Sequence, residues 1–308
     1  MLRALAALLA LAGLSLSGCG SSETTALDPI DDNPFLAYRI GSDDSFEAVT
    51  WNLHNFPNDG GSREIELVAQ AIEAMGADVV ALQEIANVPR FADLLELLPA
   101  WSGYVARSDQ FQNLAYVWLD STVTVNRVRE ILTSEWRPLP RSPLVLELTW
   151  RERSLVLVNN HLKCCGDGIL DRDDADDEEN RRWVACQLLE AWIAAEHPDD
   201  AVILLGDLND LLDDPARHNV FTPFLDRPES YLFADLAVAL GPAPGWSWGP
   251  GQSHLDHLLV SDELFAALGA DGASCATLRL DQALDGEFRT HVSDHAPVAV
   301  VLPGDELR

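Results

Sequence analysis

The sequence predicts a layered α/β protein in which helices pack outside two sheets. Two observations support this prediction. Short apolar runs of strand length outnumber the amphipathic helical segments, and helices are inserted only between particular pairs of strands. The stretch from residue 46 to 303 shows neither an internal repeat nor a linker-like change of composition, so we expect the 308-residue chain to carry one large domain.

The helices are predicted from the spacing of apolar residues. In the first helix Ile65, Val68 and Ile72 lie on one face, and Gly76 follows its last turn. In the longest helix a similar apolar stripe ends at Trp192. The predicted helices span residues 62–75, 88–98 and 180–195.

The strands are predicted from short apolar runs bounded by polar or turn-forming residues. The run 78–82 is apolar after its first residue and is therefore predicted to be a buried strand. The predicted strands span residues 46–52, 78–82, 114–119, 123–131, 144–150, 155–159, 201–205, 255–260, 276–280 and 297–302.

The N-terminus has the pattern of an export signal. Arg3 precedes an apolar run of residues 4–16, which is too short to cross about 30 Å of hydrocarbon as a helix. The run ends in Leu16-Ser17-Gly18-Cys19, which resembles the lipobox of bacterial lipoproteins. We therefore expect residues 1–18 to be a signal peptide and Cys19 to carry the lipid. An ordinary signal peptide, with Cys19 incidental, is the alternative.

Residues 19–45 are polar, acidic and contain Pro and Gly, which is typical of a tether. A lipid-anchored chain of this kind is expected at the bacterial cell envelope, on the outer membrane or the cell surface. The chain has 20 basic and 50 acidic residues, giving a net charge of −30. Such a charge repels bulk polyanions and argues against a protein that coats DNA regardless of sequence.

Four cysteines follow Cys19, and an even number in an exported chain favours one or two disulfides. They are Cys164, Cys165, Cys186 and Cys275. Adjacent cysteines rarely bond to each other because the geometry is strained. We expect one of the adjacent pair to bond to Cys186, although three full pairings are open. A zinc site is the alternative, but no Cys-x-x-Cys motif supports it.

Polar residues recur where the predicted strands end, and sheet rims are common places for active sites. Carboxylate and amide oxygens favour Mg²⁺, Mn²⁺ or Ca²⁺ over zinc. Together with imidazole they are suited to the attack of water on a phosphoester. The strand-end residues are Asn52, Glu84, Asn160, His161, Asp207, Asn209, Asp256, Asp294 and His295.

Five short motifs in this set resemble, in the same order, those of the endonuclease/exonuclease/phosphatase superfamily. They are Thr50-Trp51-Asn52-Leu53, Leu82-Gln83-Glu84, Asn160-His161-Leu162, Gly206-Asp207-Leu208-Asn209 and Ser293-Asp294-His295-Ala296-Pro297. The superfamily includes deoxyribonuclease I and bacterial sphingomyelinases. The resemblance covers residues 46–303 and implies a four-layer αββα sandwich, with two mainly antiparallel sheets inside and helices outside.

The resemblance also implies residue roles. Glu84 resembles the main metal-ligating glutamate of the superfamily, Asn52 the amide beside it, and Asp294 the second carboxylate near the metal. Mg²⁺ is the expected ion, with Mn²⁺ or Ca²⁺ as alternatives. These ligand types suit either one metal ion or two.

The catalytic roles are carried over in the same way. His295 resembles the histidine that activates water or orients the phosphate, and Asp256 the carboxylate that fixes its tautomer. His161 resembles a phosphate-contacting histidine and candidate proton donor. Asp207 and Asn209 resemble the pair that positions water and donates to the developing oxyanion.

Substrate contacts are predicted from basic residues. Arg141 resembles a superfamily position near the cleft. Arg181 and Arg182 follow the acidic run 167–179 and are expected either to reach a substrate phosphate or to offset that run. One departure concerns residue 254, where many superfamily members have Arg before Ile-Asp and this chain has His254-Leu255-Asp256. A substrate contact from that arginine is therefore absent.

The sequence thus predicts an exported, lipid-anchored, metal-dependent phosphodiesterase of the nuclease type, acting on a phosphodiester such as extracellular nucleic acid. The alternatives are a phospholipid or sphingomyelin phosphodiesterase, an inositol-phosphate phosphatase, and an inactive surface lipoprotein that only binds ligands. The membrane is contacted through the N-terminal lipid alone. No protein partner is inferred, and a monomer is expected.

Overall fold

The computed structural model describes residues 33–58, 61–107, 111–249, 251–284 and 286–307. The predicted signal peptide, the predicted lipidation site Cys19 and the first part of the predicted tether lie outside the described residues. The folded unit begins at Asn33 rather than at residue 46. Phe35 is fully buried in the core, and the Asn33 side chain donates to the carbonyl of Gln70. Residues 33–45 therefore pack on the domain.

Two six-stranded sheets form the centre of the fold, in the orders β11-β12-β1-β2-β4-β3 and β5-β6-β7-β8-β10-β9. The strands of the first sheet are β1 (Ser45–Phe56), β2 (Val79–Ile85), β3 (Trp101–Val105), β4 (Asn113–Leu119), β11 (Ser274–Thr277) and β12 (Val298–Pro303). Those of the second are β5 (Val123–Glu130), β6 (Leu144–Trp150), β7 (Arg153–His161), β8 (Val202–Asp207), β9 (Tyr231–Phe233) and β10 (Asp256–Ser261).

Each sheet has a parallel pair near its centre. Among the described strands, β1–β2 and β7–β8 pair in parallel, and every other pair is antiparallel. The C-terminal ends of parallel strands meet at one edge of the sheet. In the first sheet this register sets Asn52 opposite Gln83, and in the second it sets His161 opposite Asp207. Each parallel pair thus brings predicted site residues to a shared edge.

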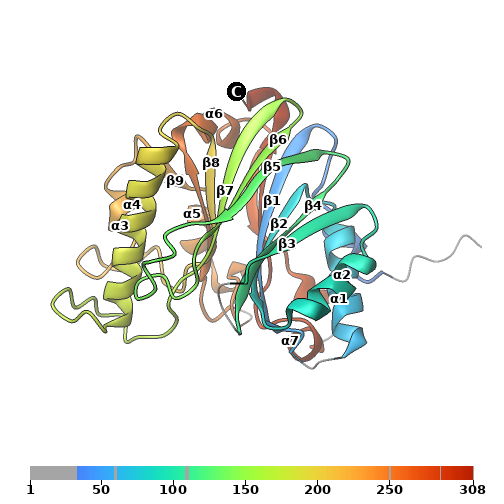
Figure 1. Cartoon of the computed structure of the whole chain (residues 1–308), viewed down its shortest axis with the longest axis horizontal. Helices are drawn as coiled ribbons and strands as arrows, with labels where there is room; N and C mark the ends of the chain where they lie inside the picture. Colours follow the sequence, from blue (N-terminus) through green and yellow to red (C-terminus); the bar gives the residue numbers. More distant parts are fainter. Residues whose placement is uncertain (1–32, 59–60, 108–110, 250, 285, 308) are drawn as a thin grey trace, which may run out of the picture. The chain divides into compact units, whose positions relative to one another are not determined.

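Helices cover the outer faces of both sheets, as Figure 1 shows. The helices are α1 (Ser62–Met75), α2 (Val88–Glu96), α3 (Glu178–Glu196), α4 (Thr222–Leu225), α5 (Leu236–Ala239), α6 (Phe265–Leu268) and α7 (Phe288–His291). Apolar side chains of α1 and α2 pack on the first sheet, and those of α3 and α4 on the second. A third apolar cluster, which includes Phe46, Trp150 and Leu157, lies between the sheets.

The predicted four-layer αββα sandwich with mainly antiparallel sheets is confirmed. The strands β3 and β9 were not predicted, because β3 is short and only partly buried and β9 has three residues. No helix in the described part of the chain has the length and apolarity needed to cross a membrane.

The cysteines differ from the expectation. All four in the described ranges are free thiols, so the expected bond to Cys186 is absent from the structure. Cys186 is 1% exposed and packs in the core between α3 and the second sheet. The sulfurs of Cys164 and Cys165 instead lie 3.0 Å from each other in the loop after β7.

Candidate active site

The site is built where strands of both sheets end side by side. The Asn52 amide nitrogen lies between two carboxylates, 3.1 Å from Oε1 of Glu84 and 2.8 Å from Oδ2 of Asp207. Asn52 comes from β1, Glu84 from β2 and Asp207 from β8 of the other sheet. The amide therefore joins the two sheets at the point where their acidic residues meet.

His161 at the end of β7 completes this group. Its Nε2 atom lies 3.5 Å from Oδ2 of Asp207 and 3.8 Å from Oε1 of Glu84. The ring is 2% exposed, and its Nδ1 atom is buried without a hydrogen-bond partner in the described structure. Burial lowers the pKa of His161 well below its ordinary value, and the positive charges of Arg141 and His295 lower it further. His161 is therefore neutral at pH 7.

His295 faces the same carboxylate oxygen, and its environment is the opposite of that of His161. Its Nδ1 atom lies 2.7 Å from Oδ2 of Asp256, and its Nε2 atom lies 3.9 Å from Oδ2 of Asp207. Burial opposes protonation, but the charge and hydrogen bond of Asp256 outweigh it. With the charges of Asp207 and Asp294 they raise the pKa of His295 to about 10. His295 is therefore an imidazolium at pH 7.

Asp207 lies between the two histidines and is 2% exposed. Burial raises its pKa, and the negative charges of Asp256 and Glu84 raise it further. The result is a pKa of about 7 for Asp207, although His295 and the Asn52 hydrogen bond act in the other direction. A carboxylate with such a pKa can accept a proton at neutral pH.

Backbone strain marks the same positions. Glu84 has φ +62° and Asn209 has φ +56°, both in the left-handed region that side-chain-bearing residues rarely adopt. The backbone N–H of Asn55 donates to Oε2 of Glu84 at 2.9 Å, and that of Asn209 donates to Oδ1 of Asp207 at 3.1 Å. The strained residues are thus held by bonds that aim the carboxylates into the site.

Buried amides between the sheets support this arrangement. The Gln83 side chain donates to Oδ1 of Asn159 at 2.8 Å, and Asn159 donates to the backbone carbonyls of Leu82 and Ala115. Gln83 and Asn159 are both fully buried. Because Gln83 precedes Glu84 and Asn159 is two residues before His161, the bond fixes the two catalytic strand ends relative to each other.

Asp294 lies beside this group. Its carboxylate oxygens lie 3.8 Å from Nδ1 of His54 and 3.3 Å from Nε1 of Trp248. His54 has φ +48° and is one residue that the motif pattern did not single out. The signal for it was only its position two residues after Asn52 on the same strand.

The donor set fits a hard divalent cation. One ligand atom each from Glu84, His161 and Asp207 lie within 4.8 Å of one another, as do atoms of Asp207, Asp256 and His295. A cation here would neutralise the acids whose mutual repulsion raises the pKa of Asp207. Glu84 and Asp207 are the residues best placed to hold it. Asn52 directs its nitrogen to the carboxylates and its oxygen to the N–H of His54, and Asp294 belongs to neither group.

The predicted substrate arginines have other contacts. Arg141 donates to the backbone carbonyls of His161 and Leu162 and to the side chain of Gln112, and so supports the end of β7. Arg181 donates to the carbonyl of Arg137 at 2.8 Å. Arg182 is 2% exposed and pairs with Glu179, the last residue of the acidic run, and with Asp210, which agrees with the alternative that it offsets that run.

A second buried network lies behind the site, and the sequence did not indicate it. Asp235 accepts from His254 at 3.0 Å and from His257 at 2.6 Å. The other ring nitrogen of His254 accepts from the N–H of Ser247, and that of His257 donates to the carbonyl of Asp210. All four ring nitrogens are used, so this group supports the loops around the site, and neither histidine has a ring nitrogen left for an ion.

Solved structures with the same fold are known. D. rerio TDP2 complexed with a single-strand DNA product has a TM-score of 0.62 and 15% identity, over 84% of this chain and 99% of that one. An endonuclease/exonuclease/phosphatase family protein of Bacteroides thetaiotaomicron has a TM-score of 0.61 and 15% identity, over 84% and 97%. A mannosyl-6-phosphatase of the same organism has 0.59 and 15%, over 84% and 100%.

At this identity these structures show the fold alone, and no curated protein matches the chain by sequence. The family model is the stronger finding. The model of the Endonuclease/Exonuclease/phosphatase family matches residues 49–295, which run from the strand that carries Asn52 to the histidine that pairs with Asp256. The chain therefore belongs to the endonuclease/exonuclease/phosphatase family of phosphoric ester hydrolases.

Proposed function

We propose that the chain is an exported, divalent-metal-dependent phosphodiesterase of the nuclease type. The observation that carries the proposal is the position of Asp207 between two histidines in opposite protonation states, with Glu84 on the same side as His161. When neighbouring groups have different pKa values because their environments differ, one can act as the acid and the other as the base.

When bound at Glu84 and Asp207, the metal supplies a positive charge that polarises a phosphoryl oxygen. The other roles belong to the chain. Asp207, whose Oδ2 faces both histidines, is placed to orient the attacking water and accept its proton. The His295 imidazolium, held by Asp256, binds a non-bridging phosphate oxygen and stabilises the charge that grows on it.

His161 and Asn209 complete the electrostatic stabilisation. Neutral His161 can donate a hydrogen bond through one ring nitrogen without adding charge. The Asn209 amide nitrogen donates to the carbonyl of Leu162 at 3.3 Å and keeps its second N–H for the substrate. Both groups lie beside Asp207, so they are placed to donate to the oxyanion that forms as water attacks.

The proposed substrate is a phosphodiester of the nucleic-acid type. A relative in fold, TDP2, is recorded with a single-strand DNA product, which supports this choice. The net charge of −30 weakens binding to long polyanions, so short substrates are favoured over duplex DNA. The proposed location is the cell envelope, with residues 1–18 as signal peptide and Cys19 as the lipid anchor, and this rests on the lipobox pattern.

The test uses the full chain with two chromogenic esters, bis(p-nitrophenyl) phosphate and p-nitrophenyl phosphate. We expect Mg²⁺-dependent hydrolysis of the diester in preference to the monoester, and loss of activity in EDTA. His295→Ala is expected to lower kcat by about 10²-fold or more. His218→Ala, a histidine whose ring contacts Arg217, is the matched control.

Two results would contradict the proposal. Hydrolysis that persists in EDTA would show that the metal has no role in the reaction. A normal rate for His295→Ala would show that the imidazolium has none. Preference for the monoester would change the assignment to a phosphatase. The lipid anchor is tested separately with Cys19→Ser. We expect this variant to be released from the membrane fraction, as measured by cell fractionation.

A further inference from the structure

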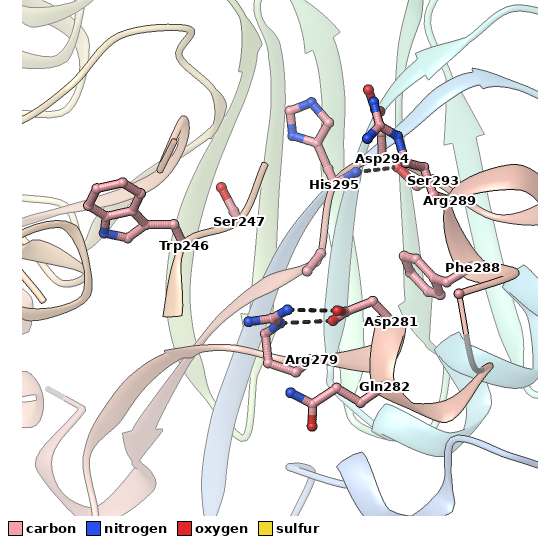
Figure 2. A pocket seen from close by; sticks show the side chains of 12 residues that line it. Trp246, Ser247, Arg279, Asp281, Gln282, Phe288, Arg289, Ser293, Asp294 and His295 are labelled. Carbon is pink, nitrogen blue, oxygen red and sulfur yellow. Dashed lines mark hydrogen bonds and ion pairs between the residues drawn. The ribbon is translucent and has the colours of Figure 1, made fainter. Parts of the chain in front are cut away.

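A cavity of about 380 Å³ adjoins the catalytic centre, and Asp294 and His295 form part of its lining. Much of the remainder comes from the segment between β11 and β12. Figure 2 shows Trp246 and Phe288 on opposite sides of this cavity, with His295 at one end. The cavity is therefore placed to receive the part of a substrate that is attached to the scissile phosphate.

The floor of the cavity is tied to the catalytic histidine. Phe288 is 2% exposed and stacks on Trp51, with 6.3 Å between ring centroids and 14° between planes. The indole Nε1 of Trp51 donates to the backbone carbonyl of His295 at 3.0 Å. The aromatic floor and the catalytic backbone thus form one packed unit, which holds a bound ring at a fixed position relative to His295.

The end of the cavity away from His295 is polar but carries no net charge. The Nε and Nη2 atoms of Arg279 donate to Oδ1 and Oδ2 of Asp281 at 2.8 and 2.6 Å (Figure 2). This bidentate pair still has unused N–H groups and lone pairs. The exposed amide of Gln282, a donor and an acceptor, lies beside it in the lining. A neutral group with its own donors and acceptors suits this end better than a second phosphate does.

Arg289 adds a positive charge to the lining, besides that of His295. Arg289 is exposed and has no hydrogen bond or ion pair with any residue that the structure describes. A free guanidinium at the rim of a strongly acidic protein attracts an anion and binds phosphate oxygens in a fork. The cavity therefore combines aromatic walls, a neutral hydrogen-bonding end and one anion-binding arm.

We propose that this cavity is a nucleobase-binding subsite, in which a base stacks on Trp246 while its polar edge meets Gln282 and the Arg279–Asp281 pair. The inference rests on the proposed phosphodiesterase function and adds the substrate class. Trp246 supplies the aromatic wall, since Phe288 is 2% exposed and already stacks on Trp51, and such a wall favours a flat ring because stacking needs a π-face. A sugar ring, with hydroxyls on its edge, is the competing occupant and is an outcome of the test.

The experiment compares three esters that share one leaving group. They are the p-nitrophenyl esters of thymidine 5′-phosphate, methyl phosphate and glucose 6-phosphate, each assayed for kcat/KM with Mg²⁺. We expect the thymidine ester to exceed the other two by about 5- to 150-fold, the range that base–aromatic stacking provides. Trp246→Ala should bring the thymidine-to-methyl ratio close to one. Trp136→Ala, a tryptophan that is 70% exposed, should leave the ratio unchanged.

Gln282→Ala provides a second variant at an exposed position, where folding is not at risk, and should lower the same ratio several-fold. Equal rates on thymidine and methyl esters would overturn the subsite while leaving the phosphodiesterase intact. A faster glucose ester would assign the cavity to sugars. If no ester is hydrolysed, the proposed function fails instead. Calorimetric binding of thymidine 5′-phosphate to wild type and Trp246→Ala then decides the subsite by itself, with equal affinity refuting it.

Discussion

Arg182 joins the loop that follows His161 to the loop that carries Asn209, and its replacement is the sharpest test of how the site is held. Its Nε donates to Oδ2 of Asp210 at 2.7 Å, and Nη1 donates to the carbonyls of Lys163 and Cys165, both at 2.7 Å. Nη2 lies 3.2 Å from Oε1 of Glu179. The guanidinium is thus bonded to the segments that follow β7 and β8 at once.

The expected loss of stability on replacing Arg182 follows from the burial of its ion pairs. The side chains of Arg182, Glu179 and Asp210 are 3%, 2% and 5% exposed. Removing one partner of a buried ion pair costs about 3–5 kcal/mol, because the remaining charge stays unpaired. Arg182→Met keeps the length of the side chain and removes only the bonds. We expect it to lower the free energy of unfolding by about 4 kcal/mol and Tm by about 10 °C.

Activity is expected to fall further than stability alone requires. Once the guanidinium is gone, the loop after β7 and the loop after β8 lose their common support. A displacement of about 1 Å at a catalytic group can cost about 10²-fold in rate, and we expect that loss in kcat/KM on the diester. Arg182→Lys keeps the charge without the fork and should fall between the wild type and Arg182→Met.

Urea unfolding and diester kinetics measure both effects. Arg63→Met is the matched control, because Arg63 pairs with Glu287 on the surface and should change stability by less than about 1 kcal/mol. The double variant of Arg182→Met with Asp210→Asn should recover part of the loss by removing one unpaired charge. A free energy of unfolding for Arg182→Met within about 1 kcal/mol of the wild-type value would refute the reasoning. A normal kcat/KM in a variant that folds but is less stable would show that Arg182 contributes to stability and not to the geometry of the site.

Two further predictions concern stability. Burial first, and then the charge of Asp78, raise the pKa of Glu47 to about 8, so the folded state holds a proton that the unfolded state has lost. The free energy of unfolding should therefore fall as pH rises from about 5 to 8, by up to about 1.4 kcal/mol per unit, and Glu47→Gln should flatten this slope in urea titrations where Glu66→Gln does not. In Gly206→Ala the new Cβ would lie 2.0 Å from the carbonyl oxygen of Asn160 at φ +148°, so we expect a loss of about 3 kcal/mol by thermal melting. Gly168→Ala, at φ +79° with open space, should lose only about 1 kcal/mol, and equal losses would exclude the clash.

The edge that carries the site could be predicted because strand ends are a local property of the sequence. An apolar run such as Val202–Leu205 stops where Gly206 and Asp207 begin, and a parallel neighbour must stop at the same edge. The helix 62–75 was predicted with its observed bounds for a similar reason. Its apolar spacing and the left-handed Gly76 at its end are both visible in the sequence.

What was missed depends on contacts between distant segments. Arg182 follows an acidic run that supplies one of its partners, Glu179, whereas its other partner Asp210 lies 28 residues further along the chain. Asp235, His254 and His257 form a buried network only because β10 passes beside the loop that follows β9. Phe35 begins a short apolar stretch, residues 35–38, in an otherwise polar segment, and its burial depends on packing against the first sheet and α1.

The two histidines of the candidate site show why residue type alone could not assign roles. Both rings are buried and both face Asp207, yet His161 has the carboxylate on one side and Arg141 behind it, whereas His295 has Asp256 behind it. Burial acts against protonation of both rings, and only at His295 is it outweighed, by the charge and hydrogen bond of Asp256. Burial also raises the pKa of Asp207 to about 7, although the His295 imidazolium acts in the other direction. The protonation states in the site therefore depend on burial and on the residues that contact the histidines from outside the site, such as Asp256. The family motifs supply the histidines and Asp207 themselves.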